Sequence, residues 1–426
     1  GLFESWRPYA PFESLTVHIG FHTLTAVFSW LTGIGSLRST LLVGQVINGL
    51  AFVTLYPLAL YGHRRNRWRG VVACLVAGLV SPMPAFYVNW GRYPQLAGQV
   101  ILPVAIWFLL VVLEAKQVKP WRLIPLGALV LAGMSLSYYR MPFYFAAFPL
   151  AWLVVTVSAR LANKDPLPWS GLVRVVPLGV LTFVIAVAWL HRLLGGNLAT
   201  AVSVGVSKST TFESVLRDYQ IWKTITVYLP RFVLVVLGLS FVLALIRKDC
   251  LRTMFGFWIV SLASLVATRL INLPGSNMMQ NFAVLIALYI PVSLVIGGGV
   301  GDLILIVVKR YGEYWHWVGA AILVLASLWF GFQQLSVVET SHIMVTRPDI
   351  RAMTWIRTNT HSEAKFLVEG FRIYEGTSVV GSDAGWWIPV LAKRKNTMPP
   401  QYALFNEQPL DPEYPDEVVG LVERLE

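Results

Sequence analysis

The chain of 426 residues is 56% hydrophobic and only 13% charged, and its mean hydropathy is +0.62. Because soluble proteins carry roughly 25% charged residues, this composition excludes an ordinary soluble domain and indicates a multi-pass membrane protein. The formal charge of +12 lies in the membrane part, since residues 1–334 hold 25 Lys and Arg against 9 Asp and Glu, whereas residues 335–426 hold 9 against 13. Anionic lipid headgroups, and not nucleic acid, are therefore the expected partners of the basic surface.

The first 38 residues are polar and aromatic at their start and apolar afterwards. An apolar run at 15–31 follows the charged residues and carries two histidines one helical turn apart. The charged residues are Glu4, Arg7 and Glu13, and the histidines are His18 and His22. No charged segment precedes an apolar one as in a signal peptide, so we expect an amino-terminal piece to lie before Gly1 and residues 1–38 to be part of a first external loop.

Apolar runs near the roughly 20 residues that cross a bilayer follow this loop. They lie at 39–61, 70–88, 96–113, 123–138, 142–158, 173–194, 227–246, 253–268, 281–300 and 317–334. Basic connectors at 62–69, 114–122, 160–174, 247–252 and 309–317 alternate with connectors that are not basic. The positive-inside rule places the basic set in the cytoplasm. Residues 335–426 are then an extracytoplasmic domain.

The same charge pattern leaves two alternatives for the run at 15–31. A spanning helix there would put residues 1–14 in the cytoplasm, whereas a helix in the outer interface would leave them outside. Two histidines and three threonines in the run favour the interfacial helix, because polar groups are costly in hydrocarbon. The predicted fold is thus an all-α polytopic membrane domain at 39–334, with about ten transmembrane helices plus an interfacial helix in 1–38. A small C-terminal extracytoplasmic α/β domain occupies 335–426.

Carboxylates are scarce before the tail, and none lies in the middle of a predicted span. Ion-driven transporters usually need a buried ionisable relay, so this scarcity argues against one. If a carboxylate serves extracytoplasmic chemistry, the candidates are Glu4, Glu13, Glu213, Asp218 and the acids of the tail.

Three of the non-basic connectors combine arginine with aromatic or amide side chains. An arginine offers a planar donor fork for phosphate, and aromatic faces stack on sugar rings. The alternative is an interfacial aromatic belt with snorkelling arginines. The candidate substrate-binding residues in these loops are Arg92, Tyr93, Gln95, Tyr139, Arg140, Arg269 and Asn272.

His18 and His22 have the i, i+4 spacing of two metal ligands on one helix face. No third ligand is identifiable in the sequence. Interfacial packing is therefore the alternative to a metal site.

The tail has the pattern of a small α/β unit. A helix is predicted to begin near Thr346-Arg-Pro348-Asp349, since Pro suits the first turn and Asp the positive end of a helix. Short strands are predicted at 366–368 and 378–381. Ser382 and Asp383 then offer a cap to a helix at 384–392, in which Trp386 and Trp387 are either core residues or a ligand-facing lid.

Two segments of the tail carry a resemblance to a known family. They are Trp355-Ile-Arg-Thr-Asn-Thr-His-Ser-Glu-Ala-Lys-Phe-Leu-Val368 and Gly381-Ser-Asp-Ala-Gly-Trp-Trp-Ile-Pro-Val-Leu-Ala-Lys-Arg394. They resemble the start of the extracytoplasmic domain in GT-C superfamily membrane glycosyltransferases, above all in oligosaccharyltransferase catalytic subunits, where a "W-R-E-N-T-P-x-x-A" helix precedes a WWDYG signature. Here Ile388 and Pro389 follow the tryptophans and Asp383 precedes them. Recognition of a peptide acceptor therefore does not carry over.

The resemblance implies an enzyme that takes a sugar from a polyprenyl-phosphate carrier at the outer membrane face and transfers it to a glycan, lipid or protein acceptor. It implies an acidic residue of the first external loop as base or metal ligand, with Mg or Mn as the possible metal. The main acid is expected upstream of Gly1, and Glu4 and Glu13 are the fallback candidates. The connector 89–99 holds no acid, which argues against metal dependence.

Arg92, Arg140 or Arg269 would neutralise the leaving phosphate. The other substrate-binding candidates are Arg7, His18, His22, Tyr93, Gln95, Tyr139, Asn272, Asp383, Trp386 and Trp387.

Two other functions remain open at this point. A transporter or flippase of lipid-linked saccharides would use the same aromatic and arginine side chains without a base. A non-catalytic membrane subunit is the third possibility.

Overall fold

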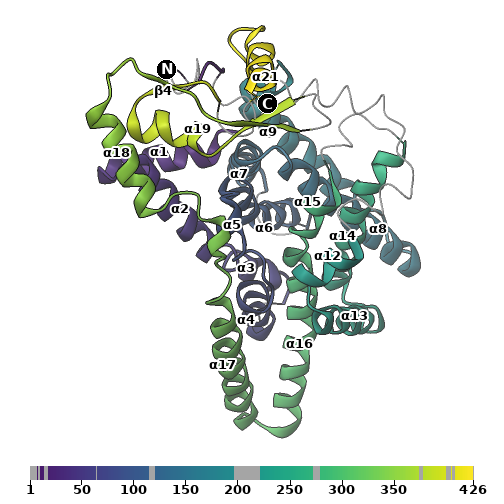
Figure 1. Ribbon diagram of the computed structural model, residues 1–426. Helices are drawn as coiled ribbons and strands as arrows, with labels where there is room; N and C mark the ends of the chain where they lie inside the picture. Colours follow the sequence, from purple (N-terminus) through teal and green to yellow (C-terminus); the bar gives the residue numbers. More distant parts are fainter. Residues whose placement is uncertain are drawn as a thin grey trace. The chain divides into compact units, whose positions relative to one another are not determined.

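The computed structural model describes residues 7, 10–13, 18–63, 65–114, 120–195, 221–271, 279–373, 378–399, 404 and 408–425 (Figure 1). The chain divides into two compact units. The membrane unit comprises His18–Ala188 and Val202–Glu339. The tail unit comprises Gly1–Val17, Trp189–Ala201 and Thr340–Glu426.

Long apolar helices dominate the described part of the chain, which confirms the multi-pass membrane class. Seven segments are long and apolar enough to cross a bilayer: Ser36–Ala59, Tyr93–Glu114, Met141–Asn163, Trp169–Leu194, Cys250–Ile271, Asn281–Tyr311 and Tyr314–Gln334. Two further apolar helices, Ile124–Ser137 and Arg231–Ile246, are shorter. A total of about ten spans stays a prediction.

The helices follow in an order that alternates between the two ends of the membrane unit. Their bounds are α1 (Gly20–Thr32), α2 (Ser36–Leu50), α3 (Leu55–Ala59), α4 (Arg67–Leu75), α5 (Tyr87–Trp90), α6 (Tyr93–Glu114), α7 (Ile124–Ser137), α8 (Met141–Asn163), α9 (Trp169–Gly195), α12 (Ile221–Tyr228), α13 (Arg231–Ile246), α14 (Cys250–Ala267), α15 (Asn281–Leu285), α16 (Tyr289–Tyr311) and α17 (Tyr314–Gln334). Short turns lie at η1 (Val76–Val80), η2 (Pro120–Arg122) and η4 (Thr268–Ile271).

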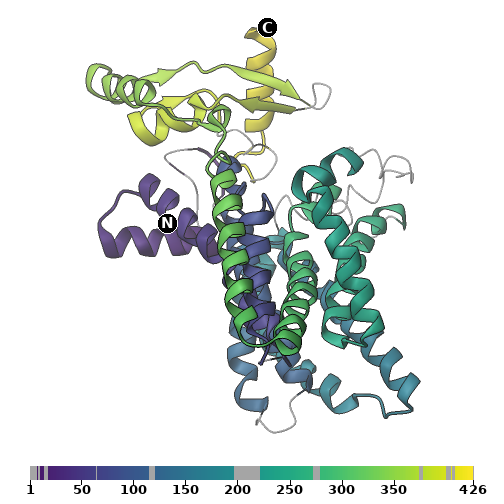
Figure 2. The same cartoon turned by 90° about the horizontal axis from the view of Figure 1, so that it is seen from below.

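Helix α1 contains 13 residues, which span roughly 20 Å at 1.5 Å per residue. The hydrocarbon core is about 30 Å thick, so this helix is too short to cross it. Figures 1 and 2 show α1 and α2 (purple) side by side at the edge of the helices. Leu24, Trp30 and Leu31 are exposed on α1, as an interfacial helix requires. An interfacial position for α1 remains the prediction that fits its length.

The stretch predicted as one span at 70–88 is not a single helix. α4 continues through the π-helical segment η1 only to Val80, and Ser81 is extended with φ −81° and ψ 136°. Ser81 precedes Pro82, and the ring of a proline disfavours helical geometry in the residue before it. The prediction was therefore wrong for the second part of this stretch.

Helices α16 and α4 pack with their backbones unusually close. A Cβ added at Gly297 would lie 2.6 Å from the Arg69 carbonyl oxygen, and one added at Gly301 would lie 2.5 Å from the Arg69 nitrogen. Small residues allow such an approach between membrane helices. α16 then turns at Gly312, whose φ is 102°, into the antiparallel α17, as the lower part of Figure 1 shows.

Asp302 lies within a helix that is longer than the predicted apolar run. The run at 281–300 was expected to end before Asp302, yet α16 continues to Tyr311. The sequence after residue 300 is less apolar, but an α-helix can include a charged side chain when an oppositely charged residue binds it. Asp302 therefore lies inside the helix, where Arg69 binds it.

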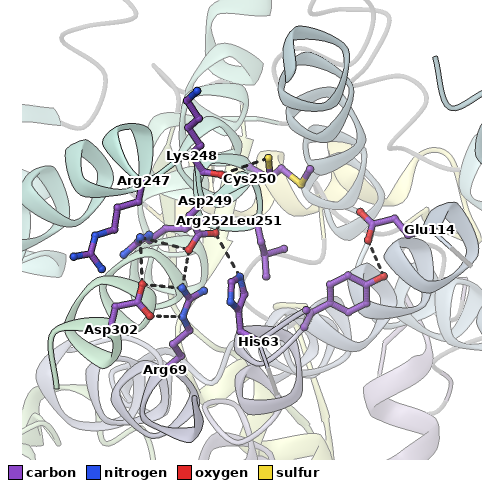
Figure 3. Close-up of a pocket in the computed structure, with 13 residues that line it drawn as sticks. His63, Arg69, Glu114, Arg247, Lys248, Asp249, Cys250, Leu251, Arg252 and Asp302 are labelled. Atoms are coloured by element: carbon purple, nitrogen blue, oxygen red, sulfur yellow. Dashed lines mark hydrogen bonds and ion pairs between the residues drawn. The ribbon is translucent and has the colours of Figure 1, made fainter. Parts of the chain in front are cut away.

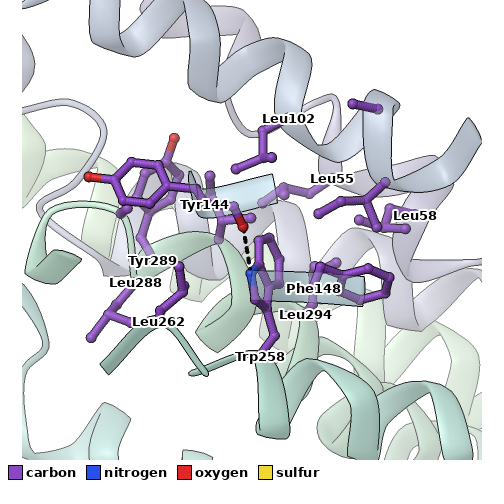
Figure 4. Packing of buried hydrophobic residues seen from close by; sticks show 14 of the residues in the cluster. Leu55, Leu58, Leu102, Tyr144, Phe148, Trp258, Leu262, Leu288, Tyr289 and Leu294 are labelled. Carbon is purple, nitrogen blue, oxygen red and sulfur yellow. Dashed lines mark hydrogen bonds between the residues drawn. The ribbon is translucent and has the colours of Figure 1, made fainter. Parts of the chain in front are cut away.

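The core of the membrane unit centres on aromatic side chains of α8 and α14 (Figure 4). Trp258 is fully buried, its ring centroid lies 5.5 Å from that of Phe148, and its indole nitrogen donates to the Tyr144 carbonyl oxygen at 3.1 Å. A buried indole N–H needs such a partner. These contacts lock α14 to α8.

The tail unit mixes short helices and strands. Its elements are η6 (Thr340–His342), α18 (Arg347–Asn359), β1 (Lys365–Phe366), β2 (Gly370–Ile373), β3 (Ser378–Gly381), α19 (Ala384–Trp387), the π-helical η7 (Ile388–Ala392), β4 (Lys395–Asn396) and α21 (Tyr414–Leu425). β1 pairs with β4 in parallel, and β2 pairs with β3 antiparallel, with Phe371 opposite Val380. Val368, Val379, Met398 and Val422 are buried together between these elements.

Candidate functional site

The predicted site residues divide between the two units. The membrane unit contains His18, His22, Arg92, Tyr93, Gln95, Tyr139, Arg140 and Arg269, and the tail unit contains Arg7, Glu13, Asp383, Trp386 and Trp387. Glu4 and Asn272 lie outside the described residues, as does the side chain of Trp386. We call the end of the membrane unit that carries 89–93, 138–140 and 335–339 the arginine–tyrosine end. The end that carries 61–69, 114 and 247–252 is called the basic end.

A turn between α7 and α8 brings one arginine and two tyrosines together. α7 ends where Tyr138 becomes extended, and Pro142 in the first turn of α8 favours a new helix start directly after Arg140. The Arg140 guanidinium lies 5.7 Å from the ring centre of Tyr138 and 5.0 Å from that of Tyr139. It also donates to the Tyr138 hydroxyl at 2.9 Å. Burial raises the pKa of Tyr139, so its hydroxyl stays protonated at neutral pH.

His18 joins this turn from the start of α1. Its ring lies 5.4 Å from the Tyr138 ring and is stacked on His22 at 5.6 Å. The Ile19 nitrogen donates to the Leu136 carbonyl oxygen at 3.1 Å, and a Cβ added at Gly20 would lie 2.7 Å from Ser137 Oγ. Only glycine permits this close approach. Burial, and secondly the nearby His22, lower the pKa of His18 to about 3, so His18 is neutral at physiological pH.

The two histidines act in packing in this structure. A metal needs three or four ligands at about 2 Å in a protein site, and no group of three or more His, Cys, Asp or Glu side chains able to hold an ion occurs in the described ranges. The rings of His18 and His22 are stacked, and no third ligand joins them among the described residues.

An apolar cavity adjoins the His18 and Tyr138 contact. It has a volume of about 500 Å³ and lies between α1, α2, α6 and α7. Its walls are formed by Ile19, Gly20, Phe21, Thr23, Leu24, Ile47, Leu50, Ala97, Val100, Ile101, Gly133, Leu136 and Ser137. Ile19 and Ser137 line the cavity and are the chain neighbours of His18 and Tyr138. The apolar cavity therefore begins beside the side chains of His18 and Tyr138.

Arg92 lies against a second set of aromatic rings at the same end. Its guanidinium is 5.5 Å from the Trp90 ring centre and 5.1 Å from that of Phe282. The Tyr228 ring packs on both, at 6.1 and 5.9 Å. Arg92 and Arg140 both act electrostatically on Tyr139 and lower its pKa, against the effect of burial.

Glu339 reaches this region because Asn89 holds the residues that follow α17. The buried Asn89 amide donates to the Val337 carbonyl oxygen at 2.7 Å, and its oxygen accepts from the Glu339 nitrogen at 3.0 Å. Glu339 and Arg92 both act electrostatically on Tyr228. The structure therefore adds a carboxylate to the arginine–tyrosine end.

Two glutamines on α6 face the interior beneath this end. Gln95 and Gln99 are fully buried, and Gln99 accepts from the Tyr289 hydroxyl at 3.2 Å. Neither polar atom of the Gln95 side chain has a hydrogen-bond partner in the described part of the chain. An unpartnered buried amide costs free energy, so Gln95 is suited to a polar ligand group.

The other predicted residues have contacts of their own. The hydroxyl of Tyr93 accepts from Gln45 at 3.2 Å, and its ring packs on Phe21. Arg269 lies in the turn η4 after α14. In the tail unit, the Glu13 nitrogen donates to the Gln408 carbonyl oxygen at 2.8 Å, and the exposed Asp383 precedes α19.

The candidate site residues from the sequence left out Tyr138, Phe282 and Tyr228, and they included Glu339 only as one of the acids of the tail. Tyr138 lay next to two chosen residues and could have been included. Tyr228 and Phe282 belong to apolar runs, and their neighbours come from distant parts of the chain. Only the fold reveals that Glu339 lies close to Tyr228.

No family model matches this chain, and no curated protein matches it. Solved structures of the oligosaccharyltransferase from Archaeoglobus fulgidus are similar to it. The complex with Zn and sulfate has a TM-score of 0.49 at 12% identity and covers 97% of this chain and 59% of its own. The complex of the same protein, AglB, with an inhibitory peptide and a dolichol-phosphate has a TM-score of 0.49 at 12% identity, with 97% and 62% covered. The form tethered to an acceptor peptide with the NVT sequon has a TM-score of 0.47 at 13% identity, with 92% and 57% covered.

This chain therefore spans about three fifths of the length of those proteins, by the shares of 59% and 62%. They are oligosaccharyltransferases, the group of the GT-C superfamily that segments 355–368 and 381–394 resemble. At TM-scores below 0.5, the function of this chain rests on its own residues.

Proposed function

We propose that this chain is part of a membrane glycosyltransferase that takes a sugar from a polyprenyl-phosphate-linked donor and transfers it to an acceptor at the outer membrane face. The arginine–tyrosine end is the reaction site in this proposal, and the basic end faces the cytoplasm by the positive-inside rule. The acceptor is a glycan, a lipid or a protein.

One observation carries the proposal: an apolar cavity lies directly beside a cationic, hydroxyl-rich group. The cavity of about 500 Å³ between α1, α2, α6 and α7 suits part of an isoprenoid chain. Arg140 and the hydroxyl groups of Tyr138 and Tyr139 suit the phosphate, because an arginine fork gives two charge-assisted hydrogen bonds to phosphate oxygens. A lipid with a phosphate at its end matches this pair of surfaces.

In the proposed reaction these residues stabilise negative charge and remove a proton from the acceptor. The bond between the sugar C1 and the phosphate oxygen breaks, and the bonding electron pair leaves with polyprenyl phosphate. A new bond forms between C1 and the acceptor atom, whose proton passes to a carboxylate. Arg140 stabilises the negative charge that grows on the leaving phosphate. Arg92, which also acts electrostatically on Tyr139, is the second cation for that role.

We assign the carboxylate role in the membrane unit to Glu339. Other described carboxylates of this unit, such as Glu114, Asp249 and Asp302, lie toward the basic end. Asn89 positions the backbone of Glu339, and a fixed backbone favours a fixed base. Glu4 and Glu13 are the alternative bases.

The test is transfer by the purified protein in lipid nanodiscs. Polyprenyl phosphate carrying a radiolabelled sugar is supplied with peptide, lipid and glycan acceptors, and labelled acceptor and free polyprenyl phosphate are measured. Arg140→Lys should lower kcat/KM by about 100-fold, the loss seen when a charge-stabilising donor is removed. Arg38→Lys, at an exposed position on α2, is the matched control and should leave the rate unchanged.

Two outcomes would contradict the proposal. Unchanged turnover in Arg140→Lys would remove the phosphate role of the arginine–tyrosine end. Passage of the labelled lipid across proteoliposome membranes with its sugar still attached, and no labelled acceptor, would identify a flippase instead. Glu339→Gln separates the candidate bases, since retained activity would move that role to another carboxylate.

A further inference from the structure

A second cavity lies at the basic end, away from the proposed reaction site. It has a volume of about 480 Å³, and its walls come from the turn after α3, from α4, the end of α6, the turn between α13 and α14, the start of α14 and Asp302 of α16. Figure 3 shows its charged side chains gathered around Asp249 and Asp302. Glu114 stands at its other side, where it accepts from the Tyr61 hydroxyl at 3.1 Å.

Arg69 satisfies both buried aspartates in this cluster. It donates to Asp302 at 2.8 and 2.7 Å and to Asp249 at 2.7 Å. Burial alone would raise the pKa of Asp249, but the hydrogen bond from His63 and the charge of Arg69 hold that pKa well below its usual range. The charged form of Asp249 is therefore favoured, and both carboxylates already have a strong partner in Arg69.

Arg252 is a second buried arginine beside the same two carboxylates, and it has no comparable bonds. It is 1% exposed, and its closest approach to Asp249 and to Asp302 is 3.4 Å. None of its three guanidinium nitrogens has a hydrogen-bond partner among the residues that the structure describes. Buried donors without acceptors cost free energy, so Arg252, although ion-paired, places guanidinium N–H groups on the wall of this cavity that can still bind an acceptor.

Two exposed cations add to this charge. Arg247 and Lys248 line the cavity and form no ion pair within the described residues. They occupy the turn from α13 into α14, where Lys248 has a φ of 52° and the Asp249 nitrogen donates to the Ala244 carbonyl oxygen at 3.0 Å. This turn holds both side chains at the rim. Four cations thus meet three carboxylates on the cavity wall, which leaves one net positive charge there.

An apolar strip leads along α13 to this rim. Leu239, Val242 and Ile246 share one face of the helix and are 67%, 52% and 73% exposed. Spacings of three and four residues place side chains on the same helix face, and in a bilayer this face contacts acyl chains. The cationic cavity therefore lies at the end of a lipid-facing surface.

We propose that this cavity binds the phosphate group of an anionic membrane lipid, whose acyl chains lie along the exposed face of α13. Arg247 and Lys248 contact the phosphate oxygens, and Arg252 supplies the buried positive charge behind them. Basic pockets between membrane helices bind anionic headgroups in this way. The site is independent of the proposed transferase activity, because its residues lie at the other end of the membrane unit.

The test measures lipid binding by thermal stabilisation of the detergent-solubilised protein. Phosphatidylglycerol and phosphatidylcholine with identical acyl chains are titrated separately, and inorganic phosphate is titrated in a third series. Phosphatidylglycerol should raise the Tm in a saturable manner, and phosphatidylcholine should not. In Arg247→Gln/Lys248→Gln the apparent affinity for phosphatidylglycerol should fall about 30-fold, since each cation near a membrane surface contributes about one kcal/mol.

A matched control separates this site from general charge attraction. Lys309→Gln/Arg310→Gln removes the same charge from exposed positions at the end of α16 and should keep the wild-type affinity. Equal weakening in both double variants, or equal stabilisation by the two lipids, would overturn the proposal. Stabilisation by inorganic phosphate that is lost only in Arg247→Gln/Lys248→Gln would support the phosphate site and assign it to a soluble anion instead of a lipid headgroup.

Discussion

Arg69 and Asp302 form a two-point contact in which Nε donates to Oδ1 at 2.8 Å and Nη2 to Oδ2 at 2.7 Å. The contact joins α4 to α16 across 233 residues of sequence. Arg69 is 5% exposed, so neither partner can exchange this contact for water. The pair should therefore matter most when only one member is removed.

Asp302→Asn should lower the free energy of unfolding by about 3–5 kcal/mol, because breaking a buried pair leaves an uncompensated charge. The Tm of the purified protein measures this loss. The double change Arg69→Met/Asp302→Leu should recover part of the stability, since apolar residues can replace a buried pair. A Tm unchanged by Asp302→Asn would show that the contact contributes little.

Gly301→Val should destabilise the membrane unit by about 1–3 kcal/mol through overpacking. Its Cβ would lie 2.5 Å from the Arg69 nitrogen, so α4 and α16 would have to separate. Gly331→Val on α17 is the control, because a Cβ there meets nothing within 4 Å. The two Tm values should differ clearly, and similar values would contradict the close packing of α4 on α16.

Gly133→Leu should weaken use of the lipid donor without loss of stability. Gly133 lines the apolar cavity, and a Cβ added there meets nothing within 4 Å, so leucine would occupy space assigned to the isoprenoid chain. Replacement of a helical glycine also favours the helix by up to about 1 kcal/mol. The expected result is a raised KM for the donor with an unchanged or higher Tm. Gly179→Leu on α9, which also has open space, should leave KM unchanged.

Acidification should loosen the contact of α1 with α7. The pKa of His18 falls from 6.5 to about 3 on folding, so between these values the unfolded state binds a proton that the folded state does not. Stability therefore decreases as the pH falls below 6.5, by up to about 1.4 kcal/mol per pH unit. The Tm measured from pH 7.5 to pH 5 should show this slope, and His18→Gln should reduce it. An equal slope in both proteins would place the titrating group elsewhere.

Local patterns in the sequence predicted local structure well. The start of α18 was expected at Thr346-Arg-Pro348-Asp349, and Asp349 accepts from the Thr346 nitrogen at 2.7 Å and from its hydroxyl at 2.6 Å in a capping box. This succeeded because a cap depends on residues three apart. The stretch at 70–88 failed because hydropathy hid the effect of Pro82 on Ser81.

These local patterns could not predict contacts between segments that are far apart in the sequence. Arg140 contacts Tyr138 and Tyr139, which are adjacent to it in sequence, and its role in substrate binding stays a prediction. The position of Glu339 depends on Asn89, 250 residues earlier in the chain. Charge counting placed Arg69 in a basic connector, but it could not identify Asp302 as its partner.

Arg69 is constrained through both its backbone and its side chain. Its backbone atoms touch Gly297 and Gly301, while its side chain binds two aspartates. A change at either glycine would shift the origin of the guanidinium and disturb the ion pairs, even though no charge is altered. Substitutions at positions 69, 249, 297, 301 and 302 should therefore be accepted or rejected as a set during evolution, with the effect of each depending on the others.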